Sequence, residues 1–313
     1  MNGTLAVVVV NYGSSALVES NLGATADDAE PAHVVVVDNY STSQERDRIR
    51  ELCARRGWEL VAPADNTGFG TGMNIGAHRA FELGATELLL LNPDARIDAA
   101  SVDALRAAVA GPGRIMASPI VRSPDGRVWF GGLDLYLDDG TIRGIRRRAD
   151  FPSAERIEWL SGACLWITRE VWDLVGGFDD GYFLYWEDVD LSARLLAAGG
   201  EVVVVRDAVA WHDEGGTHRG ADQRSEAKSA TYYYYNIRNR MLFAARHLDD
   251  SGIRAWSRTS LRAAKAILLR GGRRQFLRPV PPLRAAYRGL RDGRRIAVEA
   301  IRAHRTESSA PRA

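Results

Sequence analysis

The sequence contains little of what builds covalently braced folds. Cysteine occurs only twice in 313 residues, at Cys53 and Cys164, which lie far apart and have no paired spacing. Neither a zinc site nor a disulfide framework is therefore predicted, and a reduced, cytoplasmic protein is expected. With 46% hydrophobic and 26% charged residues, the chain has the balance of a folded soluble protein that can bury a sizeable core.

Long apolar runs and the common nucleotide-binding patterns are also missing. No apolar run approaches the roughly 18 to 20 residues that cross a bilayer. The apolar start LAVVVVNY is too short for a signal peptide and lacks its basic flank and cleavage site. No G-x-G-x-x-G follows this first run, and GxxxxGK[ST] occurs nowhere, so neither a dinucleotide fingerprint nor a P-loop is present.

Acidic residues are scarce at the C-terminal end. Residues 251–313 hold 16 Lys/Arg against 3 Asp/Glu, a net charge of +13, whereas the rest of the chain has 25 against 37 and a net charge of −12. An acidic body thus carries a basic tail. Such a tail can be a solvated helical surface, bind nucleic acid or lie on anionic lipid, and an asymmetry of this size favours an anionic partner.

What the first hundred residues do contain is a regular alternation of strand-like and helix-like patterns. The β-branched runs LAVVVV and HVVVVD are typical of parallel strands buried on both faces. Helical patterns follow them in SALVESNLGAT and in STSQERDRIRELCARRG, which ends at Gly57. WELVAP, TGMNIGAHRAFELG and TELLLLNPD continue as strand, helix and strand. The alternation predicts an open, mostly parallel α/β sheet with right-handed crossovers.

Polar residues end all four of these predicted strands. Ligands of parallel α/β sheets bind beyond the carboxyl ends of the strands. One such residue alone is better explained as a turn former, but four successive strand ends indicate a ligand site. The residues are Asn11 and Tyr12, Asp38 and Asn39, Asn66, and Asn92 with Asp94.

The second half of the predicted body is less regular. Residues 114–144 are rich in turn pairs between short β-prone runs, which predicts a meander. A strand at about residues 162–167, a short helix from Arg169 and a Val-rich strand that ends at His212 are expected after it.

Between these elements, GYFLYWEDVDLSARLLAAGG sets four aromatic residues directly before Glu187 and Asp188. An apolar wall raises the pKa of a carboxyl group, and aromatic faces stack on sugars. The alternative is an acidic helix start that the helix dipole favours. In a helix beginning near Glu187, Asp190 and Arg194 can pair on the surface, which predicts a structural role for both.

Together these segments resemble the inverting family-2 glycosyltransferases with a GT-A fold, and most of all their bacterial rhamnosyltransferase-like branch. The matching blocks are VVVVNY, VVVVDNYS, NTGFGTGMNIG, LLLLNPDA, SGACLWITREVWDLVGGFDDGYFLYWEDVDLSARLLAAGG and DAVAWHDEGGT, with YYYYNIRNRMLF beyond them. The resemblance implies a Rossmann-like GT-A catalytic domain over residues 1–250. Its nucleotide-binding half spans about residues 1–98 and its acceptor-binding half about 99–250, and a basic helical extension follows over 251–313.

The resemblance also assigns the donor side of the site. Asp38 is expected to bond the nucleobase, and the loop at Asn11 and Tyr12 to pack around it. The residues assigned to the nucleotide sugar are Asn11, Tyr12, Asp38, Asn39, Asn66, Gly68, Phe69, Asn74, Asn92 and Asp94.

A divalent cation, Mg²⁺ or Mn²⁺, is implied at the fourth strand end. Asp94 closes the family's metal-binding Asp-x-Asp motif, in which Asn92 stands for the first Asp, and His212 matches the position of a second ligand. Neutralising a departing diphosphate suits a metal with few protein ligands, and an imidazole in a carboxylate-poor site favours Mn²⁺ slightly. Without the other motifs, a strand-end histidine bonded to a neighbouring residue is the better interpretation of His212.

The acceptor side is expected to supply a general base. The family pattern assigns this base to Asp188, with Glu187 holding the acceptor or orienting the loop. Gly162, Tyr185 and Trp186 are assigned to acceptor binding. Three further residues lie near enough in sequence to touch donor or acceptor phosphates: His218, Arg238 and Asn239.

Beyond Ser251, apolar and Arg positions alternate at helical spacing, interrupted by Gly271-Gly272 and by PVPP. Two basic amphipathic helices are predicted. They either lie on the inner face of an anionic membrane or pack on the enzyme or on the partner of a homodimer.

The predicted activity is metal-dependent, inverting transfer of a sugar, with dTDP-L-rhamnose as the leading donor and a UDP-hexose or UDP-galactofuranose as the alternative. The acceptor is a glycan, a glycolipid or a small metabolite. A nucleotide-sugar-binding or scaffold protein without catalysis is the alternative of another class. Nucleic-acid binding is disfavoured because no known nucleic-acid-binding module is present.

Overall fold

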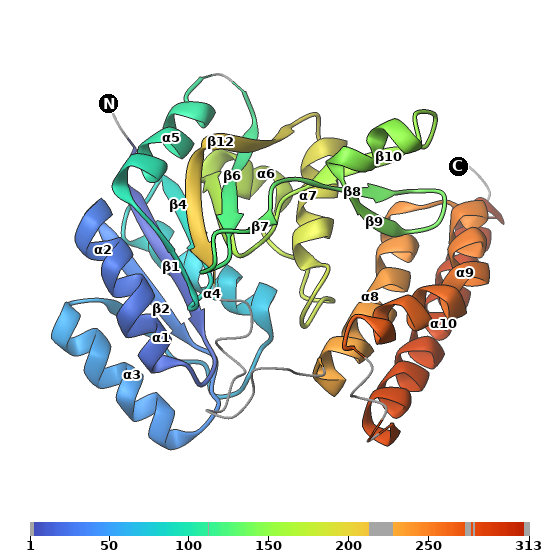
Figure 1. The fold of residues 1–313 in the computed structure, drawn as a ribbon, viewed down its shortest axis with the longest axis horizontal. Coiled ribbons are helices and arrows are strands. Elements are labelled where there is room, and N and C mark those ends of the chain that lie inside the picture. Colours follow the sequence, from blue (N-terminus) through green and yellow to red (C-terminus); the bar gives the residue numbers. More distant parts are fainter. Residues whose placement is uncertain (1–2, 112, 213–227, 273–276, 278, 310–313) are drawn as a thin grey trace. The chain divides into compact units, whose positions relative to one another are not determined.

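The computed structural model describes residues 3–111, 113–212, 228–272, 277 and 279–309. Its contacts group the chain into two compact units. The sheet unit comprises Met1–Leu133, Glu158–Phe183 and Glu187–Gly220, and the helical unit comprises Asp134–Ile157, Leu184–Trp186 and Ala221–Ala313. We describe each unit by itself (Figure 1). The expected division at residue 250 stays a prediction.

The sheet unit is built on a nine-stranded sheet among the described residues. Four parallel strands have the order β3-β2-β1-β4: β1 (Leu5–Asn11), β2 (His33–Asp38), β3 (Glu59–Val61) and β4 (Glu87–Leu91). Every residue of β1 is buried, as its β-branched run predicts for a strand covered on both faces. The expected open, mostly parallel α/β sheet is confirmed.

The sheet continues past β4 with strands from the second half of the unit. The order is β4-β11-β6-β12-β5, with β7 beside β6. Because β11 is antiparallel to both β4 and β6, and β12 is parallel to β6, strands β4, β6 and β12 run in one direction. The bounds are β5 (Ala95–Ile97), β6 (Ile115–Arg122), β7 (Val128–Phe130), β11 (Cys164–Thr168) and β12 (Glu201–His212).

Helices of the sheet unit follow their local sequence signals. Thr42 caps α3 by accepting a hydrogen bond from the Glu45 N–H at 3.2 Å, and Gly57 ends it in the left-handed conformation. The expected helix after β1 instead forms three pieces, with a π-helix in the middle. The bounds are α1 (Ser15–Leu17), η1 (Val18–Leu22), α2 (Gly23–Ala29), α3 (Ser43–Arg56), α4 (Phe69–Glu82), α5 (Ala99–Val109), α6 (Arg169–Val175) and α7 (Glu187–Ala197).

The glycines of NTGFGTGMNIG let α4 lie very close to the sheet. A Cβ on Gly76 would stand 2.4 Å from a methyl group of Val8 and 2.9 Å from one of Val37. A Cβ on Gly72 would stand 3.1 Å from both methyl groups of Val10. Side chains larger than hydrogen at these positions would push α4 away from β1 and β2, so part of the glycine-rich pattern serves helix–sheet packing.

The helical unit packs three long helices around one apolar core. Tyr233 and Ile237 of α8 meet Ala264 and Ile267 of α9 and two alanines of α10. A small sheet ordered β10-β8-β9 also belongs mainly to this unit. The bounds are β8 (Leu133–Tyr136), β9 (Thr141–Gly144), η2 (Ile145–Asp150), β10 (Arg156–Trp159), α8 (Ala230–His247), α9 (Asp250–Leu269) and α10 (Val280–Ser309).

Arg240 ties the small sheet to two of these helices. It is almost fully buried and donates to the Asp139 carbonyl, to the Trp256 carbonyl at 3.0 Å and to the Thr259 hydroxyl at 2.8 Å. Burial lowers the pKa of this guanidinium to about 10. The two predicted helices beyond Ser251 are confirmed as α9 and α10. None of the helices in the described ranges combines the length and the apolar composition needed to span a membrane.

Candidate active site

The ends of β1 and β2 bring two predicted site residues side by side. Asn11 and Asp38 are register partners, and the Asn11 amide nitrogen lies 3.5 Å from Asp38 Oδ1. Asn11 Oδ1 accepts hydrogen bonds from the Ser14 N–H and hydroxyl, both at 3.0 Å, which fixes the turn that follows β1. Tyr12 begins this turn and is exposed. The parallel pairing of the strands therefore builds this corner of the site.

Asp38 is paired with an arginine that the sequence did not indicate. The Arg46 Nε donates to Asp38 Oδ2 at 2.6 Å, and the Asp38 side chain is 1% exposed. The Arg46 guanidinium also lies 4.6 Å from the centre of the Tyr40 ring. Arg46 lies one helical turn into α3. The pair could have been predicted from the sequence, because an arginine near the start of a helix follows a buried aspartate at a strand end.

Asn39 and Asn66 hold the glycine turn before α4. Asn39 Oδ1 accepts from the Thr67 N–H at 2.8 Å, and its amide donates to the Gly68 carbonyl at 2.8 Å. Asn66 Oδ1 accepts from the Gly68 N–H at 2.9 Å. Both residues thus act on the backbone of the turn, and their assigned contacts with a nucleotide sugar stay predictions.

Gly68 is the point where this turn meets the segment before Glu187. Its φ of +88° lies in the left-handed region, and a Cβ here would stand 2.4 Å from the Phe183 carbonyl oxygen. The next N–H, of Phe69, donates to that same carbonyl at 2.9 Å. The turn before α4 is therefore hydrogen-bonded to the chain four residues before Glu187.

Asp94 and His212 come together because β12 pairs with β5. His212 is the register partner of Ala95, and its Nε2 lies 3.0 Å from Asp94 Oδ1 and 3.4 Å from the Asn92 amide nitrogen. Both Asp94 and His212 are buried. Neighbouring ligands of an octahedral ion with bonds of about 2.1 Å stand about 3 Å apart, so the two atoms fit Mg²⁺ or Mn²⁺. In the described part of the chain, no third acidic, histidine or cysteine side chain joins them.

Trp129 packs against this pair and was missed in the sequence. Its ring centre lies 4.5 Å from that of His212. The His212 Nδ1 has no hydrogen-bond partner among the described residues. Packing against an indole restricts the imidazole orientation, which a metal ligand requires. A tryptophan in a short strand after a turn gives no sequence signal of this contact.

Asp188 lies in the first turn of α7 and is held by two backbone donors. The Gly162 N–H donates to Asp188 Oδ2 at 3.1 Å, and the Val189 N–H donates to Oδ1 at 2.9 Å. Burial raises the pKa of Asp188 from its ordinary value of 3.8 to about 6, against the opposing effect of these hydrogen bonds. The carboxylate is thus oriented and more basic than an exposed aspartate.

Glu187 is the more buried of the two acids, with 6% of its surface exposed. Its pKa is raised well above 4.5, first by burial and then by the charge of Asp188. Its Oε2 has no hydrogen-bond partner among the described residues. A charge on Asp188 therefore disfavours a second charge on Glu187, so the two neighbouring acids affect each other's ionisation.

Gly162 and Ala163 connect this acid pair to the predicted metal site. The Gly162 N–H bonds Asp188, as given above, and the Ala163 carbonyl accepts from the Asn92 N–H at 3.0 Å. A Cβ on Gly162 would lie 3.4 Å from the Phe69 ring and 3.7 Å from Asp188 Cβ. The Gly162-Ala163 dipeptide therefore links the Asp188 carboxylate to the backbone of Asn92, and the assignment of these residues to a donor and an acceptor side stays a prediction.

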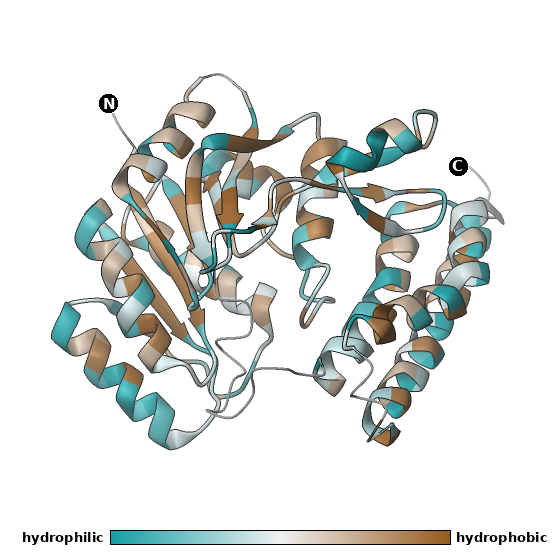
Figure 2. Cartoon of the chain, viewed as in Figure 1, coloured by the Kyte–Doolittle hydropathy of each residue, from teal (hydrophilic) through white to brown (hydrophobic). Residues whose placement is uncertain are grey.

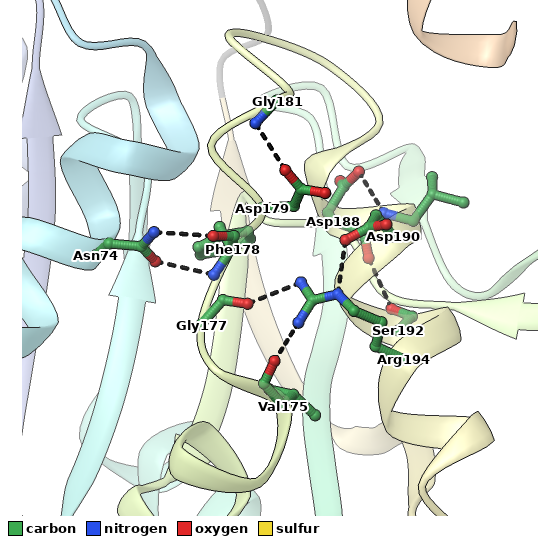
Figure 3. Close-up of polar contacts among 11 residues, drawn as sticks. Asn74, Val175, Gly177, Phe178, Asp179, Gly181, Asp188, Asp190, Ser192 and Arg194 are labelled. Atoms are coloured by element: carbon green, nitrogen blue, oxygen red, sulfur yellow. Dashed lines mark hydrogen bonds and ion pairs between the residues drawn. The ribbon is translucent and has the colours of Figure 1, made fainter. Parts of the chain in front are cut away.

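Long-range polar contacts hold the segment between α6 and α7 (Figure 3). The Asn74 amide of α4 donates to the Phe178 carbonyl at 2.9 Å and accepts from the Phe178 N–H at 2.8 Å. From α7, Arg194 donates to the carbonyls of Val175 and Gly177 and to Asp190 Oδ2. Because the Asn74 amide bonds this segment, its assignment to the nucleotide stays a prediction.

The expected pair of Asp190 and Arg194 forms, with an Nε to Oδ2 distance of 2.8 Å, and its structural role is confirmed. Its expected place on the surface is wrong, because Asp190 is 1% exposed. The reason is that Arg194 points from α7 to the backbone of residues 175–177, which covers the pair. On the same helix, Leu191 and Leu195 are fully buried.

Tyr185 and Trp186 are consecutive residues with positive φ, at +66° and +77°. Both belong to the helical unit. Trp186 is 6% exposed and packs against Phe243 and Trp256, with ring centres 5.7 and 6.3 Å away. Tyr185 is partly exposed and its ring centre lies 5.3 Å from that of Tyr232. Their assignment to acceptor binding stays a prediction.

Asn239 bonds the backbone at Tyr185, the first of these two residues with positive φ. Its amide donates to the Leu184 carbonyl at 2.9 Å and to the Tyr185 carbonyl at 2.7 Å. The Arg238 Nη1 donates in turn to Asn239 Oδ1 at 2.6 Å. The amide of Asn239 thus bonds the backbone, and the expectation that Asn239 touches a phosphate stays a prediction. His218 lies outside the described residues.

No protein-family model matches the chain. The chain is 31% identical over 239 residues to an N-acetylglucosaminyl-diphospho-decaprenol L-rhamnosyltransferase of Mycobacterium tuberculosis, covering 68% of this chain and 76% of that protein. It is 23% identical over 248 residues to a dTDP-rhamnosyl transferase of Shigella flexneri, covering 77% and 80%.

Among solved structures, a mannosyltransferase of Pyrobaculum calidifontis in complex with GDP-mannose and Mn²⁺ has the same fold. It superposes with a TM-score of 0.55 at 15% identity and covers 96% of this chain and 87% of that one. This similarity shows the fold alone.

Proposed function

Because the chain belongs to the family-2 glycosyltransferases with a GT-A fold, in their rhamnosyltransferase-like branch, we propose that it inverts the anomeric carbon during sugar transfer. The sugar comes from a nucleoside diphosphate and goes to an acceptor hydroxyl. One observation carries this proposal. The Gly162-Ala163 dipeptide bonds Asp188 on one side and Asn92 on the other, which supports our proposal that a basic carboxylate and the Asn92-Asp94-His212 group act in one site.

Asp188 is the proposed general base. Its raised pKa makes it a better proton acceptor than an ordinary aspartate, and its two backbone donors fix its direction. As the acceptor oxygen bonds to the anomeric carbon, the bond from that carbon to the diphosphate breaks and the hydroxyl proton passes to Asp188. Glu187 is more deeply buried and is proposed to hold the acceptor or orient the loop.

Asp94 and His212 are proposed to hold Mg²⁺ or Mn²⁺. The 3.0 Å between Asp94 Oδ1 and His212 Nε2 supports a shared ion. Such an ion, when bound, supplies positive charge that stabilises the departing diphosphate. The presence of Mn²⁺ in the Pyrobaculum calidifontis complex agrees with this chemistry.

The leading donor is dTDP-L-rhamnose, because two similar proteins are named as rhamnosyltransferases and one of them as dTDP-rhamnosyl. A UDP-hexose or UDP-galactofuranose remains the alternative. The nucleobase is proposed to bind where Asp38 and Asn11 meet beside Tyr12. Gly68, Phe69 and the asparagines of the turn shape the rest of the pocket. A non-catalytic nucleotide-sugar-binding or scaffold protein is the alternative of another class.

The proposed acceptor is a glycolipid of cell-wall or polysaccharide synthesis. The Mycobacterium tuberculosis relative is named for a decaprenol-linked acceptor, which supports this choice. Gly162, Tyr185 and Trp186 are proposed on the acceptor side, and the enzyme is proposed to work at the inner face of a membrane.

A panel of dTDP-, UDP- and GDP-sugars with Mn²⁺ and Mg²⁺ tests the proposal. We expect one donor to raise the melting temperature in the presence of metal, because a ligand bound only by the folded state stabilises it. The same donor is expected to be hydrolysed or transferred, and a chelator to stop the reaction. Binding of a nucleotide sugar without turnover on any acceptor would instead support the scaffold alternative.

A further inference from the structure

The helical unit carries most of the exposed large apolar side chains of the described chain. Seven of the eleven lie between residues 261 and 298, in a segment that is also strongly basic. The other four are scattered over the sheet unit, at Tyr12, Tyr40, Val128 and Leu174. Single exposed apolar residues need no explanation, but a group of them within two packed helices does.

On α10 these residues share one face. Val280, Leu283 and Tyr287 are spaced three and four residues apart and are exposed by 70%, 49% and 66%. Ala285 and Ala286, which lie on the other side of the helix, are buried in the core with α8 and α9. The spacing that places the alanines inside therefore leaves Val280, Leu283 and Tyr287 outside.

The last turns of α9 show the same division. Leu261 and Leu269 are exposed by 76% and 53%, while Ala264 and Ile267 are buried. Positions 261, 265 and 269 follow at intervals of four, and Lys265 between the two leucines is exposed. Apolar and basic side chains thus alternate on the outer face, and Figure 2 shows apolar and hydrophilic positions interleaved along α9 and α10.

The charge of this surface has one sign. Between Ser251 and Arg291 the sequence has 11 Lys/Arg and no Asp or Glu. Arg262, Arg270 and Arg284 are exposed beside the apolar residues. A surface of this composition is complementary to a partner that is anionic at its surface and apolar beneath it.

We propose that this surface docks on an anionic lipid bilayer. The docking surface is defined as Leu261, Arg262, Lys265, Leu269, Val280, Leu283, Arg284 and Tyr287. Its apolar side chains enter the interface while the cationic groups bind lipid phosphates. Nucleic acid fits less well because it offers phosphates without an apolar layer. The proposal rests on the proposed lipid-linked acceptor, to which docking would bring the enzyme.

Vesicle flotation with the full chain tests the docking surface. We expect recovery with phosphatidylcholine vesicles containing about one third phosphatidylglycerol, and little with pure phosphatidylcholine. Leu261→Ser/Leu283→Ser/Tyr287→Ser should lower the binding constant at least about tenfold. Arg262→Gln/Lys265→Gln/Arg284→Gln should lower it as well and reduce its dependence on salt. The matched control Val128→Ser/Leu174→Ser, in the sheet unit, should bind as the unaltered chain does.

Four results would overturn the proposal. They are equal recovery with neutral vesicles, unchanged binding by both triple variants, a dimer in light scattering that the apolar variant abolishes, and competition by RNA that removes all vesicle binding. Donor hydrolysis without vesicles is measured in parallel. If the triple variants lose vesicle binding and keep donor hydrolysis, the docking surface is supported. If the unaltered chain shows no donor hydrolysis, the result contradicts the proposed function and leaves the docking surface to be judged by flotation.

Discussion

Two regions of the chain that supply residues of the candidate site are positioned by different means. Strands β1, β2, β4 and β12 run in one direction. At their carboxyl ends lie Asn11, Asp38, Asn92 and His212. Sheet register alone brings these residues to one edge. We call this region the strand-end region.

Glu187 and Asp188 follow residues 176–186, which form neither helix nor strand. Contacts from remote sequence positions hold this loop: Asn74 and Phe69 from α4, Arg194 from α7 and Asn239 from α8. We call it the loop region. The proposed donor side therefore depends on strand pairing, whereas the proposed base depends on individual polar contacts.

Asp188→Asn tests the loop region at its chemical centre and has the largest expected effect. Removal of the general base should lower kcat about 10²- to 10⁴-fold and leave the donor Kd nearly unchanged. Transfer assays and calorimetric donor titration measure both quantities. Glu187→Gln is the matched control and should lower kcat less. An Asp188→Asn variant that keeps most of its activity would remove the base assignment.

The raised pKa of Asp188 gives this prediction a pH dependence. A base must be deprotonated, so kcat/KM should fall about tenfold per pH unit below about 6 and be flat above it. Because the folded state binds this proton more tightly than the unfolded state does, stability should fall as pH rises from about 4 to about 6. Asp188→Asn should therefore melt no lower than the unaltered chain at pH 7.5. A rate constant that is flat down to pH 5 would contradict the assignment.

A buried aspartate–arginine pair occurs in each region, and Asp190→Asn and Asp38→Asn remove the charge of one aspartate each. Each aspartate is 1% exposed and accepts from an arginine Nε, at 2.8 Å from Arg194 and 2.6 Å from Arg46. Breaking a buried pair costs about 3–5 kcal/mol in the free energy of unfolding. We expect Asp190→Asn to lower stability and kcat, and Asp38→Asn to raise the donor Kd as well.

Chemical denaturation and donor titration separate these outcomes. The matched control is Asp173→Asn, which removes the exposed i, i+4 pair with Arg169 and should change stability by less than about 1 kcal/mol. Equal effects of the two variants on the donor Kd would contradict the expectation that Asp38, and not Asp190, lies near the donor.

The sequence predicted the strand-end region better than the loop region, for a physical reason. Period-two and period-3.6 patterns show which residues lie at strand ends, and Asn11, Asp38, Asn92, Asp94 and His212 were predicted in this way or from the family pattern. The contacts of the loop region depend on side-chain directions in tertiary structure, which no local pattern encodes.

Particular residues show where the prediction ended. The bond of the Asn74 amide to the backbone of Phe178, 104 positions away, was not predicted, and the assignment of Asn74 to the nucleotide stays a prediction. The Asp190–Arg194 pair was predicted from its spacing, but its burial was not, because the segment that covers it lies 17 to 19 positions before Arg194. The i, i+4 spacing therefore predicted that Asp190 pairs with Arg194, but it did not predict that the pair is buried.

Gly68→Ala tests the contact between the two regions. The alanine methyl group would meet the Phe183 carbonyl at 2.4 Å and force a φ of +88° on a residue with a Cβ. We expect a loss of about 1–3 kcal/mol in the free energy of unfolding and a lower kcat, because the carbonyl belongs to the loop that leads to Glu187. Gly57→Ala is the matched control, since its φ is +67° but nothing lies within 4 Å of its Cβ. Equal losses in both variants would mean that the Phe183 contact contributes nothing.

Asn239→Ala tests the contacts that hold the end of the loop region, directly before Glu187. The variant leaves the carbonyls of Leu184 and Tyr185 without their amide donor, which should cost about 1–3 kcal/mol. Tyr185 and Trp186 are then free to leave the left-handed region, and Glu187 follows Trp186 directly in the chain. Transfer should therefore slow while the donor Kd stays constant. Asn236→Ala, one turn earlier on α8, removes a bond to the Tyr232 carbonyl and should leave kcat unchanged.

A double-mutant cycle separates positioning from a general loss of stability. Glycine adopts a positive φ without strain, so Tyr185→Gly lets the turn keep its shape when the amide donor is absent. The fall in kcat caused by Asn239→Ala should then be smaller in the Tyr185→Gly background than in the unaltered chain, and comparing ratios cancels any direct contribution of the Tyr185 ring. Identical ratios in the two backgrounds would mean that Asn239 stabilises the helical unit without holding the turn, and that the contacts of Asn74, Phe69 and Arg194 position the loop region without it.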